Sequence, residues 1–193
     1  MKVLKKIDYN APVVLSFAIV SFIALILAYI TSGAVNTLLF STYRFSMLSP
    51  MTYLRMFTHV LGHANWEHYS GNMMIILLIG PMLEEKYGSK KLLSLILLTA
   101  FITGAVNNLI FPNTALLGAS GVAFMMIVLS SVTSFRDGKI PLTLIVTVIL
   151  YLGGQIADGL FARDNISQLT HILGGIIGGV YGVMAHGKGS YEA

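Results

Sequence analysis

A run of about 20 residues without a charged side chain, from Pro12 to Thr31, limits what this chain can fold into. A helix rises about 1.5 Å per residue, so a run of this length crosses a hydrocarbon core of about 30 Å. Only 10% of the 193 residues are charged, whereas soluble domains carry about 25%. The sequence therefore predicts an integral membrane protein and not a soluble domain with a large core.

Further apolar segments follow the first, and they predict an all-α membrane protein. We expect six transmembrane helices in a single domain over residues 1–193. Because no small-residue cleavage site follows the first run, we expect that run to be a retained helix and not a signal peptide. The expected spans are Pro12–Thr31, about His68–Leu83, Leu92–Phe111, Leu116–Phe135, Ile140–Ala157 and Asn165–Ala185.

Lysine and arginine side chains predict the orientation, because cytoplasmic loops carry an excess of them. With the N-terminus in the cytoplasm, nine of the 12 basic residues lie inside, and Arg44, Arg55 and Arg163 lie outside. Six spans then return the C-terminus to the cytoplasm. The chain has no cysteine, which excludes disulfides and thiol chemistry.

About 35 residues separate the first two expected spans. Loops of this length without structure of their own are uncommon. This loop is rich in Leu, Phe, Met and Tyr, so we expect short interfacial helices within it. We interpret Arg55 and His63 as anchors of the loop.

Four polar side chains fall in the outer third of the expected bundle. Ser120 lies about four residues into the fourth span and His171 about six residues into the sixth, which are depths of ~6 Å and ~9 Å. His68 and Asn72 open the second span and share a helix face, since they are four residues apart. Polar groups inside a bilayer cost free energy, so each is a candidate functional residue.

Small residues beside these groups predict close helix packing. Gly118 and Gly121 flank the serine of the fourth span, while Gly174 and Gly178 share a helix face with His171. Glycines on facing surfaces allow two helices to approach at backbone distance. We expect this approach to bring the histidine within hydrogen-bond reach of the serine.

This set of side chains is suited to acyl transfer. A serine nucleophile needs a base, and histidine suits this role because its pKa lies near neutrality. The tetrahedral intermediate needs donors aimed at its oxyanion. The backbone N–H of Ser120 and the side chains of His68 and Asn72 can supply them. No carboxylate is tied to His171 by spacing, so the sequence predicts a Ser–His dyad.

These residues resemble the rhomboid family of intramembrane serine proteases. The family's motifs are GxSG, a histidine followed by GxxxG, and HxxxxHxxxN. The matching residues lie in the fourth, sixth and second spans and are Gly118, Ser120 and Gly121; His171, Gly174 and Gly178; and His63, His68 and Asn72. The order of the motifs, the six spans and the long first loop also match, and the likeness extends from about Arg55 to Gly182.

The resemblance implies an endopeptidase that cuts transmembrane proteins near the outer surface of a prokaryotic cell membrane. It implies transmembrane-protein substrates and membrane lipid as partners, no cofactor and no nucleic-acid partner, and it leaves the oligomeric state open. At the position of Phe124 the family places an aromatic ring stacked on the catalytic histidine. Glu84 stands at the family's acidic position after the second span. The loop 162–168 and the fifth span would form the cap and lateral gate.

Other interpretations of the same residues remain open. Ser120 alone is more often a packing residue, and the chain can be an inactive rhomboid-like binder or chaperone. A transporter would place polar groups near the midplane and in both leaflets, whereas here they cluster on one side. His59, His63 and His68 are spaced as metal ligands can be, but no cysteine or well-placed carboxylate joins them, so no metal is expected.

Overall fold

The structure is a computed structural model in which most of the chain is helical. Among the described residues there is no strand beyond one isolated bridge between Thr42 and Leu116. This confirms the all-α fold for that part of the chain. The described residues are 8–111, 113–132 and 165–189, together with Leu142, Ile145, Val146 and Ile149.

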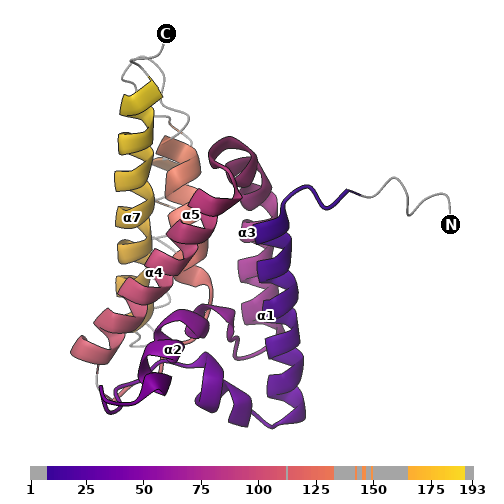
Figure 1. Ribbon diagram of the computed structural model, residues 1–193, viewed down its shortest axis with the longest axis vertical. Coiled ribbons are helices and arrows are strands. Elements are labelled where there is room, and N and C mark those ends of the chain that lie inside the picture. The colour runs from indigo at the N-terminus through magenta and orange to yellow at the C-terminus, as the bar shows by residue number, and fades with distance from the viewer. Residues whose placement is uncertain are drawn as a thin grey trace, which may run out of the picture.

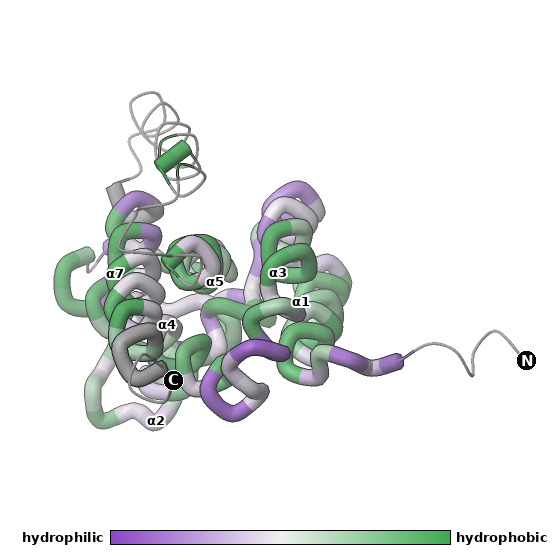
Figure 2. Tube along the Cα trace, turned by 90° about the horizontal axis from the view of Figure 1, so that it is seen from above, coloured by the Kyte–Doolittle hydropathy of each residue, from purple (hydrophilic) through white to green (hydrophobic). Residues whose placement is uncertain are grey.

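The helices pack as a bundle with α5 in its middle. Seen from above, α5 lies between α7 on one side and α3 on the other, and α1 lies beside α3 (Figure 2). The short helices between α1 and α3 gather at one end of the bundle (Figure 1). The bounds are α1 Pro12–Ile30, α2 Pro50–Thr58, α3 Trp66–Tyr87, α4 Ser89–Ile110, α5 Ser120–Val132 and α7 Asn165–Gly189, with the π-helix η2 at Asn36–Phe40 and the 3₁₀ helix η3 at His59–Leu61.

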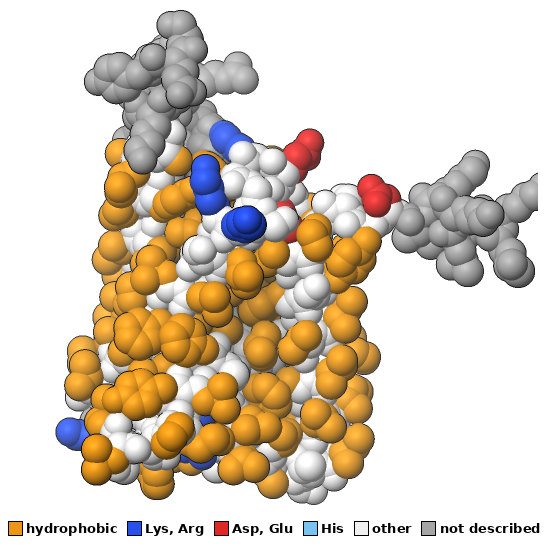
Figure 3. Space-filling model, in the orientation of Figure 1, with side chains coloured by type: hydrophobic (Ala, Val, Ile, Leu, Met, Phe, Trp, Pro, Cys, Tyr) orange, Lys and Arg blue, Asp and Glu red, His pale blue; other side chains and the backbone are white. Residues whose placement is uncertain are grey.

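Three described helices are long and apolar enough to cross a membrane: Pro12–Ile30, Ser89–Ile110 and Gln168–Ala185. α5 is apolar but shorter. On the face that Figure 3 shows, hydrophobic side chains cover the body of the bundle, and charged side chains lie near its ends. These features support an integral membrane protein. The six spans and their orientation stay predictions, and most of the expected fifth span lies outside the described residues.

The helix at the second expected span, α3, contains that span and extends beyond it at both ends. α3 begins two residues before His68, because the Asn65 side chain accepts a hydrogen bond from the backbone N–H of His68 at 2.8 Å and caps the helix. The helix also runs four residues past its predicted end, to Tyr87. It stops at Gly88, whose φ of +81° favours glycine.

At the fourth expected span the predicted start of the helix was wrong, because α5 begins at Ser120 and not at Leu116. Leu116 instead exchanges two backbone hydrogen bonds with Thr42, of 2.8 and 2.9 Å. Gly118 then turns the chain with a φ of +128°, which is open to glycine and strained for other residues. Ser120 is thus the first residue of its helix, where backbone N–H groups have no partner within the helix.

The long first loop contains short helices, as the sequence predicts. Arg55 of α2 anchors them: its Nε donates to the Leu38 carbonyl at 2.9 Å, and its guanidinium lies 4.6 Å from the centre of the Tyr43 ring. From α4, the Asn107 side chain donates to the Thr42 carbonyl at 3.2 Å. These bonds hold the loop against the bundle.

Glu84 joins the ends of three helices. Its buried carboxylate accepts hydrogen bonds from the backbone N–H groups of Val13 and Val14, at 2.9 and 3.0 Å, in the first turn of α1. It also accepts the hydroxyl of Ser89, which opens α4, at 2.7 Å. The first N–H groups of a helix lack intrahelical partners and carry partial positive charge, so a carboxylate there is stabilising.

α5 and α7 approach at backbone distance. A Cβ added to Gly174 would lie 2.1 Å from the carbonyl oxygen of Gly121. A Cβ added to Gly178 would lie 2.2 Å from the carbonyl oxygen of Met125. Real Cβ atoms do not come this close to backbone, so these positions of α7 admit only glycine without moving the helices apart.

We expect Gly178→Ala to destabilise the protein and Gly179→Ala to be neutral or stabilising. A Cβ at Gly179 would meet Val128 at an ordinary 3.5 Å, and both substitutions gain similar helix propensity, about 1 kcal/mol. Overpacking costs only Gly178→Ala about 1–3 kcal/mol, so its Tm in detergent should lie about 5 °C below that of Gly179→Ala. Equal Tm values for the two variants would contradict the backbone contact.

We expect Glu84→Gln to weaken the bundle by about 1–3 kcal/mol, the cost of leaving a buried donor unsatisfied. The glutamine amide nitrogen cannot accept the second N–H of α1. Denaturant unfolding in mixed micelles measures the loss. Glu85→Gln is the matched control, because Glu85 is the exposed neighbour and should unfold as the wild type does. A Glu84→Gln variant that unfolds like this control would show that the carboxylate contributes nothing.

Candidate functional site

The first turns of α3 and α5 and the first half of α7 carry the predicted site residues. His68 is the third residue of α3, and Ser120 is the first residue of α5. His171 lies in α7 and is 1% exposed, whereas Ser120 is half-buried. Contacts between these elements determine how the side chains are arranged.

The imidazole of His68 lies directly against the backbone of Gly118. A Cβ added to Gly118 would lie 2.6 Å from Cε1 and 2.7 Å from Nε2 of that ring. The positive φ of Gly118 independently favours glycine. The ring of His68 is therefore held against the chain two residues before Ser120.

Asn72 lies one turn after His68 on the same face of α3. Its Nδ2 donates to the carbonyl of His68 at 3.0 Å, and the residue is 6% exposed. The ring of His63 contacts the ring of His68 edge-on, with 5.0 Å between their centres. These neighbours hold the His68 ring and the Asn72 amide in place.

The residues next to Ser120 and His171 touch each other. A Cβ added to Gly121 would lie 3.3 Å from the carbonyl oxygen of Thr170. Gly121 directly follows the serine in sequence, and Thr170 directly precedes the histidine. The start of α5 and the part of α7 that bears His171 thus lie at one level of the bundle.

Phe124 contacts the ring of His171 with 6.1 Å between ring centres and 56° between planes. The resemblance implied a stacked ring, and the observed pair is tilted. A Cβ added to Gly175 would lie 2.8 Å from Cε1 of Phe124. Gly175 therefore makes room for the aromatic ring, a role that the sequence analysis did not assign. Its signal in the sequence was the doubled glycine at 174–175.

His59 is a further residue that the sequence analysis missed as part of this region. Its backbone carbonyl accepts the N–H of Gly118 at 2.9 Å, and its Nε2 donates to the carbonyl of Ala100 at 3.0 Å. Burial lowers the pKa of His59 to about 4, and burial together with the nearby His68 lowers the pKa of His63 to about 4. Both are thus neutral at pH 7. The bond between the His59 carbonyl and Gly118 was not predicted, because a pattern of side chains does not show which backbone groups will pair.

The hydrogen bonds of these histidines also bear on the metal alternative. Nε2 of His59 donates a hydrogen bond to the carbonyl of Ala100, and Nδ1 of His63 lies 3.2 Å from the carbonyl of Leu61. Residues 8–111, 113–132 and 165–189 contain no group of three or more side chains that could hold a metal ion. One nitrogen of each of these two rings thus bonds to a backbone carbonyl, while Nδ1 of His59 and Nε2 of His63 have no hydrogen-bond partner among the described residues. The expectation of no metal stays a prediction.

Comparison with known proteins adds independent evidence. The sequence model of the rhomboid domain family matches residues 50–188 of this chain. "Rhomboid protease GluP" of Bacillus subtilis is 30% identical over 180 residues, 89% of this chain and 34% of that protein. "Rhomboid-like protein 11, chloroplastic" of Arabidopsis thaliana is 28% identical over 131 residues, 60% of this chain and 46% of that protein. "Rhomboid-related protein 1" of Caenorhabditis elegans is 28% identical over 137 residues, 66% of this chain and 38% of that protein.

The chain spans between about a third and a half of the length of these relatives. The matched rhomboid domain covers well over half of the chain and includes all the predicted site residues. The relatives come from a bacterium, a plant and an animal. On this evidence the chain belongs to the rhomboid family, whose general activity is intramembrane proteolysis.

Proposed function

We propose that this chain is an intramembrane serine endopeptidase that uses Ser120 as nucleophile and His171 as base. The observation that carries the proposal is the contact of Gly121 with Thr170, because it joins the immediate neighbours of the two residues. In this proposal residues 1–193 form one six-span domain of a prokaryotic cell membrane, with both termini in the cytoplasm.

The proposed reaction is two-step acyl transfer. The Ser120 hydroxyl attacks the scissile carbonyl carbon while His171 takes its proton. The C–N bond then breaks, His171 returns the proton to the leaving amine, and the acyl group stays on the serine. Water attacks this ester in the second step, again with the histidine as base, and regenerates the free serine.

The oxyanion would be bound by donors at the start of α5 and α3. The N–H of Ser120 has no partner within its helix and lies at the positive end of the helix dipole. Asn72 uses one amide N–H on the carbonyl of His68, and a primary amide has two, so the second remains for the substrate. His68 would supply a ring N–H beside Gly118. Donors held in place before the reaction stabilise the developing charge most effectively.

The substrate would be a transmembrane protein cut near the outer membrane surface. A helix hides its carbonyls in its own hydrogen bonds, so the cut site must be presented as an extended peptide. Helix-breaking residues and a small residue at the cut site favour this presentation. The reaction requires no metal or other cofactor and involves no nucleic acid.

We expect a fluorophosphonate probe to label the detergent-purified wild type and not Ser120→Ala, which lacks the acceptor oxygen. His171→Ala should label about 10²–10⁴-fold more slowly, the usual contribution of a general base. Ser131→Ala is the matched control, because this α5 hydroxyl bonds only to the Ile127 carbonyl within its own helix. An unlabelled wild type, under conditions where another rhomboid protease reacts, would favour the inactive binder.

We expect Gly118→Ala to reduce the labelling rate at least about 10-fold, because the new methyl group displaces the His68 ring, and loss of one oxyanion donor costs about 10²–10³-fold. Gly88→Ala separates this effect from backbone strain: Gly88 has a φ of +81° and open space around its Cβ position. It should lose stability, measured as Tm, without losing labelling. Equal labelling by both variants would remove His68 from the proposed oxyanion site.

A further inference from the structure

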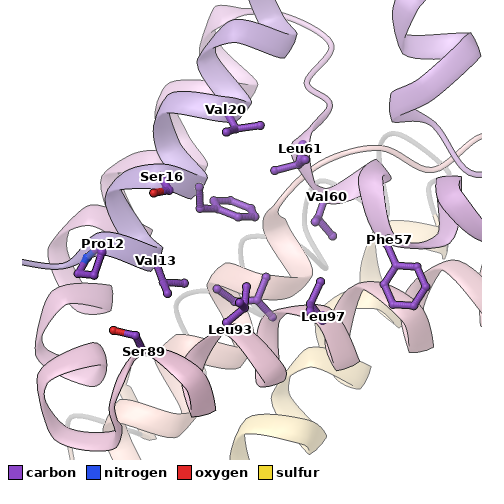
Figure 4. Close-up of a pocket in the computed structure, with 12 residues that line it drawn as sticks. Pro12, Val13, Ser16, Val20, Phe57, Val60, Leu61, Ser89, Leu93 and Leu97 are labelled. Atoms are coloured by element: carbon purple, nitrogen blue, oxygen red, sulfur yellow. The ribbon is translucent and has the colours of Figure 1, made fainter.

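A groove lies between α1 and α4, and residues of α2 and η3 also line it. Its volume is about 490 Å³, within the range of small-molecule binding sites. Val13 and Val20 come from α1, Leu93 and Leu97 from α4, and Val60 from η3 (Figure 4). Apart from two serine hydroxyls, the lining side chains are apolar. None of the proposed catalytic residues lines it.

Side chains that line the groove are partly exposed on the outside of the bundle. Val20 and Leu93 are both 44% exposed, and both belong to helices that are long and apolar enough to span a membrane. Water does not fill an apolar groove well, because it needs two to four polar partners. An apolar occupant would instead supply the dispersion contacts that the lining side chains lack.

The length of the groove favours an acyl chain over a transmembrane helix. From Ser89 to Leu97 the α4 wall runs about 12 Å, close to the ~15 Å of one leaflet's hydrocarbon. A helix of a substrate or of a second copy would instead run along the full hydrocarbon depth of about 30 Å. The groove therefore matches one acyl chain of one leaflet better than a spanning helix.

Basic side chains stand at one end of the groove. Lys90 and Lys91 follow Ser89, the groove residue at the start of α4, and both are exposed. Lys90 is three and seven residues before Leu93 and Leu97, so it shares their helix face. Lysine and arginine side chains gather over the α3–α4 turn (Figure 3).

Of the acidic side chains at that end of the groove, Glu84 already accepts three hydrogen bonds. Glu84 is bound by the N–H groups of α1 and by Ser89. Glu85 and Asp8 are exposed. Each basic residue near a membrane surface contributes about 1 kcal/mol to attraction of anionic lipid.

We propose that this groove binds one acyl chain of an anionic phospholipid. The lipid comes from the leaflet on the side of the α3–α4 turn, and its phosphate rests against Lys90 and Lys91. The chain runs along α1 and α4 and ends beneath Val60 of η3. The site is independent of the proposed proteolytic activity.

Native mass spectrometry after mild detergent exchange tests the site. Val20→Trp and Leu93→Trp fill the groove from opposite walls, and Ile19→Trp is the matched control, because Ile19 is 51% exposed on α1 but does not line the groove. We expect one phospholipid on the wild type and on Ile19→Trp, and at least about fivefold less on the two groove variants. Retention by the groove variants equal to that of the control would overturn the proposal, as would a wild type without lipid.

Lipid competition on the unaltered protein tests the headgroup and does not depend on any variant folding. Phosphatidylglycerol, phosphatidylcholine and oleate are added in turn. We expect phosphatidylglycerol to be retained about 10-fold better than phosphatidylcholine, a difference of about 1.4 kcal/mol, and Lys90→Gln/Lys91→Gln to remove this preference. Equal retention by the wild type would overturn the anionic headgroup, and a preference for oleate would overturn the phospholipid. Thermal melts confirm that each variant compared is folded.

Discussion

Backbone contact between α5 and α7 is the constraint on which the rest of the structure depends. Glycines at 174 and 178 let α7 lie against the carbonyl oxygens of Gly121 and Met125, with no side chain between the helices at these two positions. Once the backbones touch, Phe124 reaches the ring of His171. A helix pair held apart by side chains, at the usual axis separation of about 8–10 Å, would not bring these residues so close.

The stretch before α5 is held from three sides. Thr42 pairs with Leu116, the carbonyl of His59 accepts the N–H of Gly118, and the ring of His68 packs on Gly118. These partners come from the first loop, from η3 and from α3, and each is fixed by bonds of its own. Such a stretch has little freedom to move, which is what a preorganised oxyanion site requires.

The sequence predicted those features that depend on spacing along one helix. The uncharged run gives α1 its bounds almost to the residue, and the spacing of His171, Gly174 and Gly178 gives the packing face of α7. The start of α5 was not predictable in the same way, because it depends on Leu116 pairing with Thr42, more than 70 residues earlier. Periodicity extends a helix through apolar residues and carries no information about such a partner.

Backbone atoms account for the other omissions. His59 was considered for its imidazole, and it is its carbonyl that holds Gly118. Glu84 was noted only for its position in a motif, and its partners are N–H groups about 70 residues away. Every residue has these backbone groups, so no choice of side chain marks which of them will be used.

The membrane makes opposite demands on the proposed proteolytic site and on the proposed lipid groove. Where water is scarce, polar groups must satisfy one another, and so the stretch before Ser120 is fixed by many short bonds. An apolar groove has no such bonds, and its lining side chains gain contacts only from an apolar occupant. The turn η3 belongs to both regions, because Val60 and Leu61 line the groove while His59 holds Gly118. In the proposal the acyl chain packs beneath the turn whose first residue, His59, holds Gly118, while the proteolytic site itself needs no occupant in the groove.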